Sequence, residues 1–210
     1  MQKAALGCLA VLLVAVLLIA VTAASTYNGL VMASQGVDGQ WAQVQNVYQR
    51  RADLVPNLVS TVAGAANFEK STLTEVTAAR ASVGQVKIDP NQAPTDPAQL
   101  AQFQAAQGQL GSALSRLLVV VERYPDLKAN ANFRDLQAQL EGTENRIAVE
   151  RGRFNESVQS FNVRVKTFPT VLVAGALGFH PKPYFQAAAG SETPPKVNFD
   201  FGASPAPVAK

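Results

Sequence analysis

Apolar residues recur every seven positions along most of this 210-residue chain, and this spacing predicts long helices with one buried face. The clearest row lies in the second half of the chain and consists of Phe133, Leu140, Ile147, Phe154, Phe161 and Phe168. Leu136 lies beside the N-terminal part of this row, and Val158 and Val165 lie beside its C-terminal part, on the other side. A straight helix of 3.6 residues per turn produces this sideways drift of a seven-residue repeat. We predict that the row is core, with Phe154 and Phe161 buried, and that the helix ends at Pro169.

A second apolar row predicts helix from about residue 27 to about residue 86. Its members are Trp41, Tyr48, Val55, Val62, Val76 and Val83, with Val37, Val44, Leu58 and Ala65 in a companion row. Pro56 interrupts it, because proline removes a backbone hydrogen bond and clashes with the preceding turn. A kink or break is therefore expected near Arg51–Leu54, with Asp53 placed to cap a new helix. Whether Pro56 bends the helix or reverses the chain is open.

Proline marks the next connection. Residues 87–97 contain Pro90, Pro94 and Pro97, so this stretch is predicted to be a loop. Asp96 followed by Pro97 is typical of a helix start, and an apolar face then continues until Tyr124-Pro125. The chain therefore carries three or four long helices in an antiparallel, up-down order.

The N-terminal segment is predicted to be an uncleaved membrane anchor. Residues 4–24 carry no charge, and 21 helical residues span about 30 Å, the thickness of a bilayer core. A cleaved signal peptide would have a shorter apolar core, and a lipoprotein site at Cys8 would need the apolar run before the cysteine. Lys3 precedes the span and no basic residue follows until Arg50, so we expect a cytoplasmic N-terminus and an extracytoplasmic body. In a Gram-negative cell this would place the span in the inner membrane and the body in the periplasm. The opposite orientation, with the body cytoplasmic, is the alternative.

These patterns predict an all-α protein in four parts. Residues 1–26 form the transmembrane anchor, 27–169 the helical bundle, 170–202 an irregular segment and 203–210 a disordered tail. The irregular segment is rich in glycine and proline yet apolar, so it is expected to pack on the bundle.

Composition excludes several classes of function. The net charge is +3, and basic residues are interspersed with acidic ones, which argues against nucleic-acid binding. His180 is the only histidine and Cys8 the only cysteine, so a Ser-His-Asp triad and a zinc site have almost no candidates. Glu-x-x-His pairs for a di-iron site are absent from the sequence. We predict no catalytic residue, metal or cofactor, and Glu141 with Glu144 is interpreted as a solvated edge.

Several polar residues stand in otherwise apolar rows. They are Arg51, Glu69, Glu144, Arg151, Asn155 and Asn162. Unpaired buried charge is costly, so the favoured interpretation is a hydrogen-bonded network between helices that fixes their register. The alternative is a site for a ligand or partner.

Several motifs of the chain resemble the LemA family of bacterial membrane proteins. The most specific is the run Gln-Arg-Arg-Ala-Asp-Leu-Val-Pro-Asn-Leu-Val at 49–59. Others are Tyr27–Val31, Trp41 with Gln43 and Val44, Tyr124–Asn130, Gly142–Ala148, Phe154-Asn155 with Asn162, Phe168-Pro169 and Tyr184-Phe185. Phe154 and Gly152 depart from the family pattern. The resemblance implies an N-terminally anchored helical bundle and no known reaction, and some relatives are associated with building membrane organelles.

The expected function is a membrane-anchored structural or protein-interaction module. The alternatives are a homo-oligomeric scaffold that organises membrane, and a small-ligand binder or enzyme using the Arg/Glu/Asn network. In a three-helix scheme the seam at Trp41 and Tyr48 is uncovered, so we predict it as an interaction face between copies. A reversal at Pro56, or the apolar segment from Leu172 to Phe201, would cover it instead. The expected partners are lipid through residues 4–24 and an unidentified protein.

Overall fold

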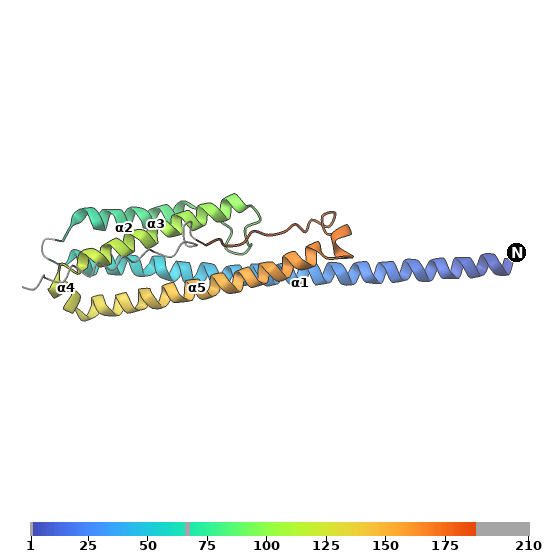
Figure 1. The fold of residues 1–210 in the computed structure, drawn as a ribbon, viewed down its shortest axis with the longest axis horizontal. Helices are drawn as coiled ribbons and strands as arrows, with labels where there is room; N and C mark the ends of the chain where they lie inside the picture. The colour runs from blue at the N-terminus through green and yellow to red at the C-terminus, as the bar shows by residue number, and fades with distance from the viewer. Residues whose placement is uncertain (1, 66–67, 188–210) are drawn as a thin grey trace, which may run out of the picture.

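The all-α architecture is confirmed by a computed structural model that describes residues 2–65 and 68–187 (Figure 1). Within these ranges there are five α-helices, one 3-10 turn and no strand. The elements are α1 (Gln2–Ala63), α2 (Lys70–Gln85), α3 (Pro97–Val121), α4 (Pro125–Ala129), α5 (Ala131–Lys166) and η1 (Thr170–Leu172).

The bundle is built along α1. This helix projects alone at its N-terminal end and then packs along α5, which runs back in the opposite direction (Figure 1). The α2–α3 hairpin packs over the half of the body that lies farther from the N-terminus, and α4 lies at the outer tip (Figure 1). Because α5 returns toward the N-terminal part of α1, the chain after Lys166 begins beside the point where α1 leaves the body.

The N-terminal part of α1 has the length and composition of a membrane span. Its most apolar 18-residue window has a mean hydropathy of 2.6, and none of that window is buried against the rest of the chain. The side chains from Leu9 to Val21 are exposed. This segment is the one candidate span among the described residues.

Pro56 does not break α1, so the predicted break near Arg51–Leu54 is wrong. The helix continues to Ala63, and the next helix, α2, begins at Lys70. Pro56 faces solvent, while Val55, Leu58 and Val62 are buried on both sides of it and hold the axis in place. Just after the end of α1, the Ala65 N–H donates to the Val62 carbonyl at 3.1 Å, a 3-10 type of hydrogen bond that closes the last turn.

The predicted apolar rows form the core. Near the membrane end the core is aromatic and includes Trp41, Phe103, Phe154, Phe161 and Phe185. Toward the outer tip it is mainly aliphatic and includes Val62, Val76, Leu110, Leu117 and Phe133. The burial of Phe154 and Phe161 confirms the prediction, but Phe168 is 80% exposed because α5 ends before it.

Side chains cap the helices where the sequence indicates. The Asp96 carboxylate accepts from the Ala98 N–H at 2.8 Å, and Pro97 is the first residue of α3. Asn130 caps α5 in the same way, accepting from the N–H groups of Asn132 and Phe133. The predicted irregular segment begins with η1 and is extended over residues 179–187. Its remainder and the predicted disordered tail lie outside the described residues.

Candidate functional site

A polar groove of about 820 Å³ lies between α1, α3 and α5, in the middle of the body. Its polar lining consists of Tyr48, Arg51, Gln104, Gln107, Glu144, Arg151 and Gln186. It therefore joins the long motif at 49–59 to two of the other polar residues that the sequence singles out.

Arg51 is the centre of this groove. Its side chain is 4% exposed, and Nη1 donates to Glu144 Oε1 at 2.8 Å. Nη2 donates to the Gln107 carbonyl at 3.1 Å and also to the Gln107 side-chain oxygen. The guanidinium lies 5.1 Å from the Tyr48 ring centroid, within the range of a cation–π contact. The buried Nε has no hydrogen-bond partner, so one donor of this arginine is unsatisfied.

Tyr48 contributes an ordinary phenol to the groove. Burial raises its pKa, and the nearby charges of Arg151 and Arg51 oppose that rise only in part. The hydroxyl is therefore protonated at neutral pH and can donate a hydrogen bond.

Two asparagines of α5 hold the extended segment against the bundle. The Asn162 amide donates to the Lys182 carbonyl at 2.9 Å and accepts from the Lys182 N–H at 2.8 Å. The Asn155 amide makes the same pair of bonds with Phe185, at 3.1 and 2.9 Å. Each asparagine thus satisfies both backbone groups of one extended residue, as a neighbouring strand would do. We call this arrangement, residues 182–185 held by Asn155 and Asn162, the asparagine clamp.

A buried ion pair lies beside the clamp. Lys182 Nζ lies 2.7 Å from Asp38 Oδ1, with side chains 6% and 11% exposed. Asp38 also accepts from the Ala93 N–H at 3.0 Å, so one carboxylate joins α1, the 86–96 loop and the extended segment. Sequence reasoning missed this pair, although a lysine between two prolines in an apolar stretch is a usable signal.

The six predicted network residues do not form one network. Arg51 with Glu144 makes one pair, and Asn155 with Asn162 makes the clamp. Arg151 extends the clamp, donating to the Gln186 carbonyl at 2.9 Å, and it also lines the groove. Glu69 lies apart, 3.1 Å from Arg123 near the outer tip, where both side chains are about half exposed. Its inclusion is wrong because α1 ends before it.

The predicted interaction face at Trp41 and Tyr48 is buried, so this prediction is also wrong. Trp41 is 0% and Tyr48 5% exposed. The Phe185 ring stacks on Trp41 with centroids 6.0 Å apart, and Phe103 contacts both residues. The chain's own segment covers the seam because α5 returns it to the membrane end. The seam therefore gives no reason to expect contacts between copies there.

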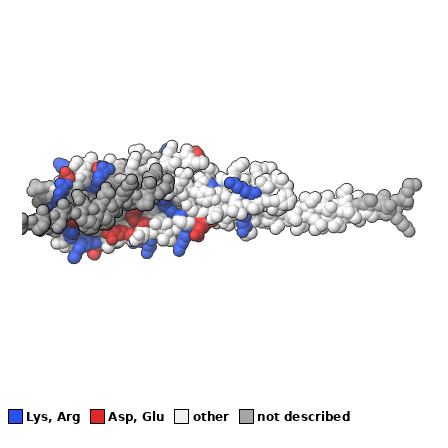
Figure 2. Space-filling model, in the orientation of Figure 1, with Lys and Arg blue, Asp and Glu red and all other residues white. Residues whose placement is uncertain are grey.

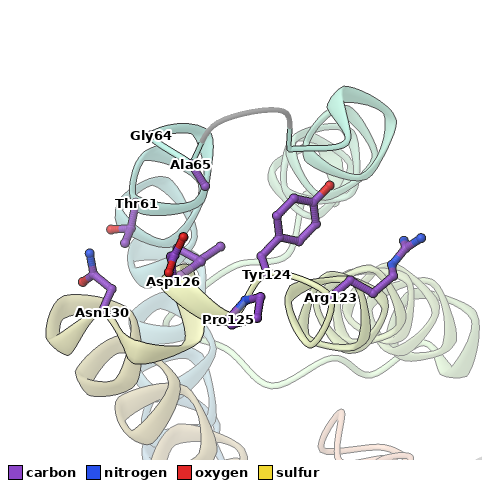
Figure 3. Close-up of a pocket in the computed structure, with 9 residues that line it drawn as sticks. Thr61, Gly64, Ala65, Arg123, Tyr124, Pro125, Asp126 and Asn130 are labelled. Atoms are coloured by element: carbon purple, nitrogen blue, oxygen red, sulfur yellow. The ribbon is translucent and has the colours of Figure 1, made fainter.

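A second pocket, of about 480 Å³, opens at the outer tip (Figure 3). Thr61, Asp126 and Asn130 line it, while Arg123 points away from the other lining side chains (Figure 3). The Asn130 oxygen is already used to cap α5. No described side chain that lines this pocket brings a buried charge into it.

The chemistry available in the groove is electrostatic. Arg51 and Arg151 offer two guanidinium groups against one carboxylate, an arrangement that suits an acidic group. Among residues 2–65 and 68–187 no group of three His, Cys, Asp or Glu side chains is placed to hold a metal ion.

Comparisons with known proteins show which sequences this chain resembles. A sequence model of the LemA family matches residues 40–199. The chain is 26% identical over 161 residues to Protein LemA of Metamycoplasma hominis, covering 77% of this chain and 69% of that protein. It is 34% identical over 89 residues to Magnetosome protein MamQ of Magnetospirillum gryphiswaldense and 33% identical to Magnetosome protein MamQ 1 of Paramagnetospirillum magneticum. Each of these two matches covers 42% of this chain and 33% of the relative, so the chain spans about a third of the magnetosome proteins.

Proposed function

The chain belongs to the LemA family, and from that premise we propose that it is a membrane-anchored, non-catalytic module that works through protein partners. The unbroken course of α1 is the observation that carries this proposal. Its 62 residues extend about 93 Å, from the apolar segment to the outer tip of the body. A single helix that serves as both span and core sets the distance between the body and the membrane.

The polar interior supports a structural role. Asn155, Asn162 and Asp38 bond to the backbone of irregular segments, and Arg51 is paired with Glu144. Buried polar groups used in this way fix one arrangement of the chain, and none of them is left as a free acid or base for catalysis.

The relatives favour a membrane role over a reaction. Several of them are named as magnetosome proteins, and the family resemblance implies no known reaction. We extend only the membrane-associated, non-enzymatic character to this chain, because it covers a third of those proteins.

We propose that the N-terminus is cytoplasmic and the body extracytoplasmic, since Lys3 precedes the span and the next basic residue is Arg50. A Ser60→Cys variant in a Cys8→Ala background places one exposed thiol on the body. A membrane-impermeant maleimide should label it in intact spheroplasts. Labelling only after lysis would reverse the orientation.

Proximity labelling in cells tests the module itself. A labelling enzyme fused after Lys210 should mark a reproducible set of proteins with the wild-type chain. The set should persist in an Arg51→Met, Glu144→Met double variant, which removes both charges of the pair and leaves neither buried alone. It should be lost in Phe161→Asp, which disrupts the core but leaves the span unchanged. Identical labelling by wild type and Phe161→Asp would contradict a role for the folded body.

The groove supports a second candidate, the binding of a small anion. The unpartnered Nε of Arg51 and the adjacent Arg151 favour it. Inorganic phosphate or succinate, added at constant ionic strength, should then raise the Tm of the wild type but not of the Arg51→Met, Glu144→Met variant. Equal shifts for both proteins, or none, would exclude the groove as the site.

A further inference from the structure

We propose that the loop Phe168–Leu177 inserts into the membrane interface beside the span and gives the protein a second lipid contact. We call these residues the apolar loop. The inference rests on the proposed anchoring through α1 and goes beyond it, because a single span alone leaves the body free to tilt.

The apolar loop displays large hydrophobic side chains to solvent. Phe168 is 80% exposed and Leu172 71%, and Val171, Val173 and Leu177 are 40–50% exposed. Exposed apolar side chains elsewhere on the described body, such as Val119 and Val149, lie singly on their helices. A contiguous group of this kind on a monomer marks a surface that is covered in use.

The position of the apolar loop indicates that lipid is what covers its exposed side chains. Arg164, at the end of α5, lies 3.4 Å from the Gly29 carbonyl of α1, and the Phe179 ring lies 6.0 Å from that of Tyr27. The segment predicted to span the membrane ends at Ala24, only five residues before Gly29, a rise of about 8 Å along the helix. The apolar loop therefore lies at the height where α1 leaves the bilayer. A protein partner bound at the outer tip of the body would not reach the loop.

Charged residues are absent from the parts of both elements that lie toward the span. Residues 167–179 carry no charge, and neither do residues 4–37 of α1. Arg164 and Lys166 occupy the last turn of α5. In Figure 2 the part of the projecting helix that is drawn in white shows no blue or red, and charged side chains begin on the body. An apolar tip bordered by basic residues suits a lipid interface with anionic headgroups.

The backbone of the apolar loop suits a medium with little water. The N–H of Val171 donates to Thr167 at 2.9 Å, that of Leu177 to Val173 at 3.0 Å, and that of Phe179 to Ala174 at 2.9 Å. Ala174 faces inward and is 1% exposed, so the loop has one side on the bundle and one outside. Internally bonded backbone removes the main cost of placing an irregular segment near hydrocarbon.

Fluorescence quenching in proteoliposomes tests the proposal on the full chain. Three single-cysteine variants in a Cys8→Ala background, Leu172→Cys, Val119→Cys and Val16→Cys, each carry an environment-sensitive dye. The vesicles contain phosphatidylcholine and phosphatidylglycerol, with a nitroxide quencher near the headgroup or deep in the chains. Circular dichroism confirms that each labelled variant keeps its helix content.

The shallow quencher should strongly reduce emission from position 172 and leave position 119, an equally exposed apolar site, unchanged. The deep quencher should act on position 16. Quenching at 16 with none at 172 would overturn the apolar loop proposal while the anchor stands. A blue-shifted dye at 172 without nitroxide quenching would show that protein, including a second copy, covers the loop, and would also overturn it. Absence of quenching at both positions would overturn the anchor and the loop together.

Discussion

The two halves of the body are closed in different ways. In the outer half the α2–α3 hairpin packs on α1, the core is mainly aliphatic, and the ion pairs Arg116–Glu75 and Arg123–Glu69 lie on the surface. In the membrane-proximal half the core is aromatic, and its cover comes from the 86–96 loop, the extended segment and the start of α3, which brings Leu100 and Phe103.

This difference explains where the buried polar side chains lie. A helix satisfies its own backbone, but an irregular segment brings unpaired N–H and C=O groups to the core it covers. In the proximal half these groups are met by side chains of the bundle: Asn155 and Asn162 for the extended segment, and Asp38 and Trp41 for the 86–96 loop. Among the described residues of the outer half, where the cover is mainly helical, no asparagine holds an extended segment in this way. Two of the polar interruptions in the apolar rows, Asn155 and Asn162, are thus the means by which a non-helical cover is held.

Removing an aromatic from the proximal core should have the largest effect. Phe161→Ala should lower the free energy of unfolding by about 3–5 kcal/mol, since Phe161 is 1% exposed and its loss leaves a cavity. Denaturant titration in mild detergent, followed by circular dichroism, measures it. Val163→Ala, at an exposed position of the same helix, is the control. Equal midpoints for the two variants would place the aromatic row outside the core.

Breaking the buried ion pair should come next. Lys182→Met leaves Asp38 buried without its cation and should cost about 3 kcal/mol. An Asp38→Leu, Lys182→Met double variant removes both charges and should recover part of the loss, although the Ala93 N–H then lacks its acceptor. The same denaturant titration compares them. A double variant no more stable than Lys182→Met alone would argue against the pair as the cause.

The asparagine clamp should contribute less. Asn155→Ala leaves the backbone of Phe185 without partners on that side and should cost about 1–3 kcal/mol. Hydrogen exchange should rise at the amides of residues 184–186 and stay unchanged in α2, which belongs to the outer half. Uniformly faster exchange in both halves would mean that the asparagine supports the whole fold.

The smallest effect is expected in the outer half. Glu75→Gln removes an exposed ion pair with Arg116 and should change stability by less than about 1 kcal/mol, with the difference vanishing at high salt. Thermal melts at low and high salt measure it. A loss as large as that of Lys182→Met would remove the contrast between the halves.

Much of this fold follows from local patterns. The seven-residue rows predict the core positions of α5, and Asp96-Pro97 marks the start of α3. Local sequence does not determine whether α1 continues past Pro56. The helix continues because the residues on both sides of the proline are buried against other helices. Whether one helix or two precede the 87–97 loop decides the direction of α5. That direction decides whether the extended segment reaches Trp41, so the cover of the seam could not be predicted from spacing.

The site residues, too, divide into those that local sequence reveals and those that depend on the three-dimensional fold. Arg51 and Asn155 are conspicuous as polar residues in apolar rows, but their partners depend on which helices meet. Asp38 and Lys182 are 144 positions apart, and no periodicity links an α1 residue to an extended segment. Long-range pairs of this kind require the three-dimensional arrangement.

The continuity of α1 through Pro56 is the claim on which the rest depends, and a distance measurement between spin labels tests it directly. Gln35→Cys and Ser60→Cys, in a Cys8→Ala background, place labels on exposed sites on either side of the proline. Twenty-five helical residues separate them, which corresponds to about 38 Å along a straight axis. In lipid nanodiscs we expect one narrow distribution near that distance, with allowance for the label arms. A broad distribution, or a maximum well below it, would show that the helix bends or reverses at Pro56 and would contradict a rigid connection between membrane and body.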